Sequence, residues 1–172
     1  MSDPVVLERL VLRPARTGDV RTIRTFIDAY STDGRLLSKA TVTLFEAVQE
    51  FLVAELDGEV VGCGALHVMW EDLAEVRTLA VSPDYAGKGI GSALLTELMD
   101  RARAVGVKRV FCLTFMVDFF GAHGFEEIEE TPVDHSVYEQ LLQSYDEGVA
   151  EMLGLERVKP NTLGNHRMLA IL

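Results

Sequence analysis

The segment from Val81 to Leu95, VSPDYAGKGIGSALL, constrains the fold more than any other part of the chain. It begins at the end of an apolar strand pattern, continues through glycines at alternate positions, and ends in an apolar helical pattern. Glycine lets the backbone turn so that several N–H groups converge. A following helix adds unpaired N–H groups and the positive end of its dipole. The segment therefore predicts a strand, an anion-binding loop and a helix, and this loop suits a pyrophosphate.

Two other interpretations of the glycines compete with this one. A dinucleotide fingerprint requires an acidic residue about 20 positions downstream, at the end of a second parallel strand. Asp100 is near that distance but falls inside the predicted helix, which disfavours a dinucleotide site. The plainer alternative, in which Gly87, Gly89 and Gly91 only make a tight turn, stays open at this point.

The charge of the chain limits its partners. Its 172 residues are 48% hydrophobic and 25% charged, which suits one globular domain over residues 1–172, and the net charge is −11. Such a charge repels nucleic acid and anionic lipid, so neither is an expected partner, and an anionic ligand would need local donors. No apolar run approaches the roughly 20 residues of a membrane span, and no signal peptide is recognisable. The expected location is cytoplasmic, where Cys63 and Cys112 would be buried free thiols rather than a disulfide or metal pair.

Hydrophobic periodicity predicts an α/β fold with a mixed sheet. Strands are expected at Leu7–Arg13, Phe51–Leu56, Glu59–Val68, Ala74–Val81, Val107–Thr114, from Gly124–Phe125 onward, and at Arg167–Leu172. Helices are expected from Thr17 or Asp19 to Tyr30, at Thr41–Gln49, at Ser92–Val105 with a stripe from Ala93 to Val105, around Val117–His123, and at Val137–Leu153. Asp57-Gly58 favours a tight primed turn between two strands. Ser31–Ala40 and Lys159–Asn165 are expected to be loops.

The glycine segment resembles motif A of the GCN5-related N-acetyltransferase (GNAT) superfamily, V-x-P-x-x-R/Q-x-x-G-x-G/A. The stretch Phe119–Phe125, FFGAHGF, is similar to the short helix of that family that ends in G-F. The resemblance covers about Leu7 to Ile128. It implies the GNAT fold, a mixed and mostly antiparallel sheet flanked by helices, whose splayed central strands hold acyl-CoA. One departure is Ala86, which stands where the family usually has Arg or Gln.

The resemblance also implies a reaction, the direct attack of an amine on the thioester of acetyl-CoA, with no metal. The pantetheine arm would lie along Leu79–Val81, and the Val81 amide would stabilise the oxyanion. The expected cofactor-binding residues are Leu79, Ala80, Val81, Ala86, Gly87, Lys88, Gly89, Ile90, Gly91 and Ser92.

Four further stretches resemble the short, stand-alone N-acetylglutamate synthases of arginine biosynthesis, of the mycobacterial type. These stretches are Asp72–Val81, Gly34–Lys39, Gly62–His67 and Leu113–Phe120. The resemblance implies transfer of the acetyl group to the α-amino group of L-glutamate or L-glutamine. The longer synthases carry an amino-acid-kinase-like domain for which this chain has no room.

Residue types favour an acceptor site near the strand that precedes the loop. An α-carboxylate suits the fork of Arg77, with Lys39 and Arg35 as further cations from a loop that also contributes Leu37. Glu75, two residues from Arg77, can act as the base that deprotonates the amine. Alternation places Glu75, Arg77 and Leu79 on one face, and Val76, Thr78 and Ala80 on the other. The alternatives are a solvated Glu75–Arg77 salt bridge and solvated loop cations.

The proton donor for the leaving thiolate stays open. Many GNAT enzymes use a tyrosine at the position of Phe120, so this chain needs another acid, either water or one of Tyr85, Tyr138 and Tyr145. His123 and His67 are expected to pack or be solvated. The acidic segment Ser136–Asn165 is expected to cover the acceptor pocket or to form a homodimer contact.

Three hypotheses for the function therefore remain at this level. The first is an amino-acid N-acetyltransferase. The second is a GNAT enzyme for another amine, such as a peptide N-terminus, a polyamine or a drug. The third is a non-catalytic acyl-CoA-binding regulator, suggested by Ala86 and Phe120.

Overall fold

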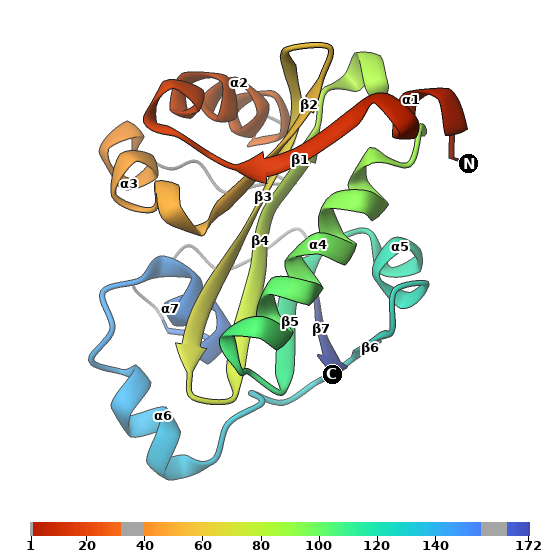
Figure 1. Cartoon of the computed structure of the whole chain (residues 1–172). Helices are drawn as coiled ribbons and strands as arrows, with labels where there is room; N and C mark the ends of the chain where they lie inside the picture. Colours follow the sequence, from red (N-terminus) through yellow and green to blue (C-terminus); the bar gives the residue numbers. More distant parts are fainter. Residues whose placement is uncertain (1, 32–39, 156–164) are drawn as a thin grey trace. The chain divides into compact units, whose positions relative to one another are not determined.

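A computed structural model describes residues 2–31, 40–155 and 165–172 of the chain. Contacts divide it into two compact units, Met1–His67 with Val76–Val105, and Val68–Glu75 with Gly106–Leu172. The described strands form a seven-stranded sheet in the order β1-β2-β3-β4-β5-β7-β6 (Figure 1). β4 and β5 pair in parallel, whereas β1–β2, β2–β3, β5–β7 and β6–β7 pair antiparallel. The predicted α/β class and mixed sheet are thus confirmed.

The first unit holds the N-terminal helices and the glycine segment. Its elements are α1 (Pro4–Arg9), β1 (Leu10–Pro14), a 3-10 turn (Thr17–Asp19), α2 (Val20–Ser31), α3 (Thr41–Glu46), a 3-10 turn (Val48–Glu50), β2 (Phe51–Leu56), most of β3 (Glu59–Trp70), the end of β4 (Leu73–Val81), a 3-10 turn (Pro83–Tyr85) and α4 (Ile90–Val105). The predicted hairpin is confirmed, because Asp57 and Gly58 have φ of 51° and 86°, as a primed turn requires.

Helices cover both faces of the sheet in this unit. A Cβ added to Gly62 or Gly64 would lie 3.1 Å from Leu94 or 2.8 Å from Leu98, both on α4. Cys63, next to these glycines on β3, instead packs among residues of α2 and α3. Since neighbouring strand residues point to opposite faces, α4 lies on one face and α2 with α3 on the other. Figure 1 shows the same arrangement for these elements.

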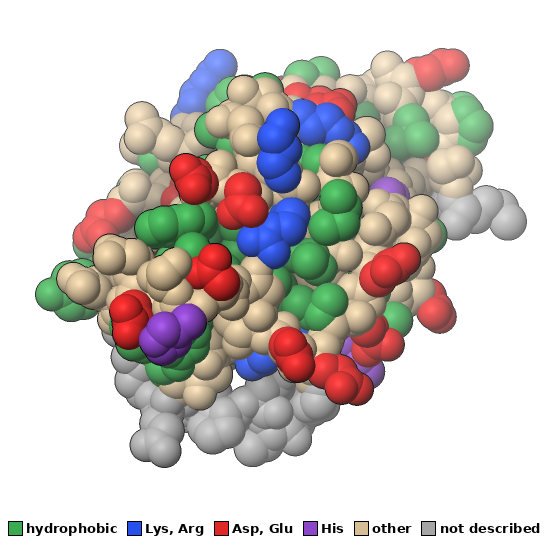
Figure 2. All heavy atoms as spheres, turned by 90° about the horizontal axis from the view of Figure 1, so that it is seen from below, with side chains coloured by type: hydrophobic (Ala, Val, Ile, Leu, Met, Phe, Trp, Pro, Cys, Tyr) green, Lys and Arg blue, Asp and Glu red, His purple; other side chains and the backbone are tan. Residues whose placement is uncertain are grey.

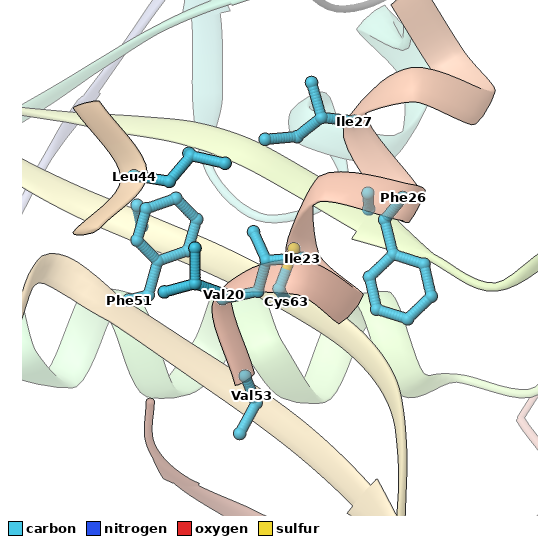
Figure 3. Packing of buried hydrophobic residues seen from close by; sticks show 10 residues of the cluster. Val20, Ile23, Phe26, Ile27, Leu44, Phe51, Val53 and Cys63 are labelled. Carbon is cyan, nitrogen blue, oxygen red and sulfur yellow. The ribbon is translucent and has the colours of Figure 1, made fainter. Parts of the chain in front are cut away.

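The core on the α2 face is a continuous apolar cluster, part of which Figure 3 shows. It consists of Val20, Ile23, Phe26, Ile27, Leu44, Phe51, Val53, Cys63, Ala65 and Ala80. The α2 members recur at helical spacing, so one stripe of the helix is buried and the opposite side is solvated. Burial of this stripe anchors α2 to the strands that carry the candidate site.

The second unit contains the C-terminal half of the chain. Its elements are the end of β3, the start of β4, β5 (Arg109–Thr114), α5 (Val117–Gly121), β6 (Phe125–Glu127), α6 (His135–Leu141), α7 (Glu147–Leu153) and β7 (His166–Ile171). Its apolar cluster consists of Met69, Leu73, Phe111, Leu141, Val149, Met152 and Leu153. The last strand β7 pairs with both β5 and β6 and so closes the sheet between them.

Four predictions about the elements were wrong in part. The predicted helix Thr41–Gln49 ends at Glu46, and a 3-10 turn follows it. Leu7–Arg9 belong to helix α1 rather than to a strand, because Pro4 can begin a helix and the Asp3 side chain accepts hydrogen bonds from the Val5 and Val6 N–H groups. The predicted helix Val137–Leu153 is two helices, and the Asp146 side chain caps the second of them. Val105 was predicted to end the apolar stripe of α4, but its side chain is 59% exposed, so the buried part of the stripe ends before it.

Candidate functional site

The end of β4 departs from regular strand geometry. Its parallel pairing with β5 covers only Leu73–Glu75, and Thr78 has a φ of +56°. Beyond Thr78, Leu79 lies on the α4 side beside Gly64, whereas Ala80 packs in the α2-side cluster. Leu79 and Ala80 thus point to opposite faces, as alternation requires of neighbouring strand residues. A β-branched residue rarely adopts the left-handed region, so Thr78 marks a distortion of the strand.

Cys63 stabilises this irregular point. Its Sγ lies 3.5 Å from the Thr78 carbonyl oxygen as a donor, and it also accepts a hydrogen bond from the Ala80 N–H. Burial raises the pKa of the Cys63 thiol to about 12, so the thiol keeps the proton that it donates. Burial likewise raises the pKa of Cys112, and the charge of Glu75 adds to this effect. Both cysteines are buried and free, as predicted.

The peptide group after Val81 is held from two sides. The Ser82 N–H donates to the Val61 oxygen of β3 at 2.8 Å, and the Tyr30 hydroxyl donates to the Val81 oxygen at 2.6 Å. The Val81 C=O and the Ser82 N–H belong to one trans peptide and therefore point in opposite directions. Because the Ser82 N–H points toward β3, the Val81 carbonyl points away from it. Because the N–H and C=O of one strand residue point to the same side, the Val81 N–H also points away from β3.

The glycine loop presents open backbone before α4. Ala86 and Gly87 are exposed, and Gly87 has a φ of +75° with nothing within 4 Å of an added Cβ. Ile90, Gly91 and Ser92 form the first turn of α4, where N–H groups have no acceptor within the helix. The Ile90 side chain is buried, so only its backbone can face a ligand. These amides and the helix dipole fit a pyrophosphate group.

The N-terminal segment contacts the same loop, which the sequence did not predict. The Asp3 N–H donates to the Lys88 oxygen at 3.0 Å, and the Asp3 carboxylate lies 3.6 Å from Lys88 Nζ. Gly89 has a φ of +91°, and an added Cβ would lie 3.0 Å from Ser2. Lys88 thus has an anionic neighbour of its own, and Gly89 is needed for packing as well as for the turn.

The predicted acceptor residues are only partly described. Glu75 is 5% exposed and belongs to the second unit, where its register partner on β5 is Phe111. Arg77 is half-buried and belongs to the first unit. Arg35, Leu37 and Lys39 lie outside the described residues. The structure therefore brings Glu75 and Arg77 onto one strand, β4, and leaves the loop cations as expectations.

The aromatic candidates for the proton donor differ in their surroundings. Phe120 is 5% exposed and packs edge-on against Phe125 with ring centroids 5.2 Å apart, which gives it a structural role. Tyr145 is 96% exposed, and Tyr138 packs against the apolar cluster of the second unit. Tyr85 lies half-buried in the 3-10 turn before the loop. Tyr30, which the sequence pattern placed only at the end of a helix, donates its hydroxyl to the Val81 carbonyl oxygen of β4.

Two histidines also have defined partners. His67 Nδ1 lies 2.8 Å from a Glu50 carboxylate oxygen, and His123 Nδ1 lies 2.7 Å from the Phe119 carbonyl oxygen. Within the described ranges no three His, Cys, Asp or Glu side chains are grouped to hold a metal ion, and no helix there is both long and apolar enough to cross a bilayer. On the face in Figure 2, basic side chains are interspersed among acidic ones.

Comparisons with known proteins agree with this geometry. The model of the acetyltransferase (GNAT) family matches residues 22–125. An amino-acid acetyltransferase of Mycobacterium tuberculosis is 55% identical over 95% of this chain and 95% of its own. An amino-acid acetyltransferase of Neisseria meningitidis is 36% identical over 69% of this chain but only 28% of its own.

Solved structures give the same result. A protein from Mycobacterium tuberculosis in complex with CoA superposes with a TM-score of 0.90 and 55% identity, covering 94% of this chain and 99% of the other. N-acetylglutamate synthase from Neisseria gonorrhoeae, complexed with coenzyme A and N-acetyl-glutamate, has a TM-score of 0.76 and 26% identity over 95% of this chain and 35% of its own. The predicted membership is confirmed: this chain belongs to the GNAT family of acetyltransferases.

Proposed function

We propose that the protein transfers the acetyl group of acetyl-CoA to the α-amino group of L-glutamate, or of L-glutamine, and that residues 1–172 act as one transferase domain. The geometric observation behind acyl transfer is the Val81 N–H, which points away from β3 at the end of the strand that leads into the glycine loop. An amino acid as acceptor is supported by the amino-acid acetyltransferase that matches 95% of both chains, and glutamate is supported by the N-acetylglutamate synthase from Neisseria gonorrhoeae. We further propose a place in arginine biosynthesis, which the likeness to N-acetylglutamate synthase supports.

The cofactor would be held mainly by backbone groups. The pyrophosphate fits the amides of Gly87 and of the first turn of α4, and this accounts for binding by a chain with a net charge of −11. Ala86 offers no side-chain donor, so Lys88 is the cation that remains in the loop. The pantetheine arm would follow Leu79–Val81, beyond the point where β4 pairs with β5.

The chemistry assigns one role to each acceptor-side residue. Arg77 would hold the α-carboxylate, assisted by Lys39 and Arg35. Glu75 would take the proton of the ammonium group directly or through water, so that the amine can attack the thioester carbonyl. The Val81 N–H would then stabilise the negative charge that develops on the carbonyl oxygen. As the C–N bond forms, the nitrogen loses its second proton, the C–S bond breaks, and the thiolate takes up a proton, so that the reaction releases one H+ overall.

One assay separates this function from its alternatives. Release of free CoA is measured with each of the twenty amino acids, with peptides and with polyamines. We expect the highest kcat/KM with glutamate or glutamine. Turnover confined to peptides or polyamines, with Arg77→Ala silent, would indicate a GNAT enzyme for another amine. Tight acetyl-CoA binding without turnover on any amine would indicate a regulator.

The role of Glu75 has its own prediction. Glu75→Gln should lower kcat about 100-fold or more at neutral pH, because a positioned base is worth that much. The loss should shrink at high pH, where the amine deprotonates without help. The measurement is the pH profile of kcat for both proteins. An unaltered neutral rate would remove Glu75 from the mechanism.

A further inference from the structure

A tyrosine from outside the motif of the family is bonded to the strand end that carries the proposed oxyanion donor. Tyr30 lies in the last turn of α2, and its hydroxyl donates to the Val81 carbonyl oxygen at 2.6 Å. Tyr30 and Val81 are 51 residues apart in sequence but lie in the same compact unit. The α2 stripe that precedes Tyr30 is buried in the core, so the phenol is presented from an anchored helix.

The direction of the hydrogen bond from Tyr30 to Val81 relates it to the reaction. The Ser82 N–H points to Val61 on β3, so the Val81 C=O and N–H both point to the opposite edge of β4. The N–H and the C=O of Val81 therefore lie side by side on the edge where an oxyanion would develop. The N–H attracts that negative charge, whereas an uncompensated carbonyl oxygen repels it. The Tyr30 proton lies on this carbonyl oxygen and reduces the repulsion.

We propose that Tyr30 is a positioning residue of the acetyl-transfer reaction. Its hydroxyl holds the Val81 peptide in place and compensates the Val81 carbonyl, so that the adjacent N–H can stabilise the oxyanion. The proposal rests on the assignment of Val81 as oxyanion donor under the proposed function. The residue contributes to the transition state through Val81, and it contributes little to acetyl-CoA binding in the ground state.

The test compares two variants, each of which removes one hydroxyl from α2. Tyr30→Phe removes the hydroxyl bonded to Val81, and Thr25→Val removes an exposed hydroxyl that donates to the Thr22 carbonyl oxygen within the helix. We expect Tyr30→Phe to lower kcat about tenfold, less than the 100-fold or more for loss of an oxyanion donor itself. KM for acetyl-CoA should stay within about twofold, and Thr25→Val should behave as wild type.

A spectroscopic measurement reports on the oxyanion edge directly. The carbonyl stretch of [1-13C]acetyl-CoA is recorded by isotope-edited infrared spectroscopy in the absence of an acceptor. In wild type we expect the bound carbonyl to absorb at lower frequency than in solution, because the Val81 N–H polarises it. In Tyr30→Phe part of this shift should be lost, while thermal unfolding shows that the variant is folded.

Three outcomes would overturn the proposal. The first is a kcat for Tyr30→Phe equal to that of wild type. The second is a raised KM for acetyl-CoA with unchanged kcat, which would place the hydroxyl in cofactor binding. The third is loss of the alkaline limb of the pH profile, which would make Tyr30 itself the proton donor. If wild type shows no turnover with any amino acid, the proposed function fails instead, so the two failures are distinguishable.

Discussion

At the scale of single residues, Thr78 and Cys63 control the geometry on which the site depends. Thr78 adopts a φ of +56°, which a β-branched residue rarely does. The strain is held by the Cys63 thiol, which bridges the Thr78 carbonyl and the Ala80 N–H. Thr78 comes directly before Leu79–Val81, whose amides would face the pantetheine arm.

Cys63→Ala should therefore affect both stability and cofactor binding. We expect a loss of about 1–3 kcal/mol in unfolding free energy, from a small cavity and two lost hydrogen bonds. KM for acetyl-CoA should rise several-fold because the positive-φ conformation of Thr78 is no longer held. Cys112→Ala is the matched control, since it removes the other buried thiol and should lower stability without raising this KM. Equal KM values for both variants would show that Cys63 only fills space.

Gly87 and Gly89 make different contributions within the same loop. Both have positive φ, so an L-residue is strained at either. An added Cβ at Gly87 faces open space, whereas at Gly89 it meets Ser2. Substitution of Gly89 would therefore disturb the N-terminal segment as well as the loop.

We expect Gly87→Ala to weaken acetyl-CoA binding at least tenfold with a small change in melting temperature. Gly89→Ala should lower the melting temperature more, because Ser2 must move. Calorimetry of acetyl-CoA binding together with thermal unfolding measures both effects. Unchanged affinity in Gly87→Ala would contradict the assignment of this loop as the pyrophosphate site.

At the scale of elements, an ion-pair network ties β1 and β2 to the start of α2. Arg13 donates to both Asp19 oxygens at 2.8 and 3.0 Å and to Glu55 at 2.8 Å. Asp19 also accepts the Arg16 N–H at 2.7 Å. The hydrogen bonds from Arg13 are the main reason why the pKa of Asp19 lies below its ordinary value. This network helps to orient α2, the helix that presents Tyr30.

Asp19→Asn should lower the unfolding free energy at neutral pH by about 1–3 kcal/mol, since it leaves Arg13 with a neutral partner. A carboxyl whose folded pKa is lowered stabilises the fold above its unfolded pKa of about 3.9. That contribution is lost as the pH falls through the lower folded value. The difference in unfolding free energy between the two proteins, measured by denaturant unfolding, should thus be full at neutral pH, begin to shrink below about pH 3.9, and vanish below the folded pKa of Asp19. A constant difference at every pH would contradict the ion-pair explanation.

At the scale of the whole molecule, the net charge of −11 opposes the approach of acetyl-CoA and of glutamate, which are both anions. Binding must then rely on short-range donors such as the amides before α4. On the face in Figure 2, acidic side chains also surround the basic ones.

Added salt should therefore increase kcat/KM for acetyl-CoA. Between about 10 mM and about 150 mM monovalent salt, the Debye length shrinks from about 30 Å to about 8 Å, which screens the repulsion. We expect kcat/KM to rise about twofold while kcat changes little. The check is initial-rate kinetics over this range with a neutral viscogen as control. A fall in kcat/KM with salt would show that local cations dominate the encounter.

The sequence by itself determined the family, the mixed sheet and the glycine loop, because these depend on local patterns. Neighbouring residues alone define the strand alternation, the helical spacing and the Val81–Leu95 motif. These patterns predicted most strands and the start of α4 closely. The boundaries that failed, at α1 and between α6 and α7, depended on side-chain caps from Asp3 and Asp146 that compete with periodicity.

Only the tertiary structure decided how β4 ends. The positive φ of Thr78 is stabilised by Cys63 on another strand, and the carbonyl of Val81 is bonded by Tyr30 on a distant helix. No periodicity encodes such contacts, since they join residues that are far apart in the chain. The glycine loop could be predicted from the sequence because its anion-binding groups lie within a few consecutive residues. The direction of the Val81 N–H depends on hydrogen bonds that form only in the folded chain.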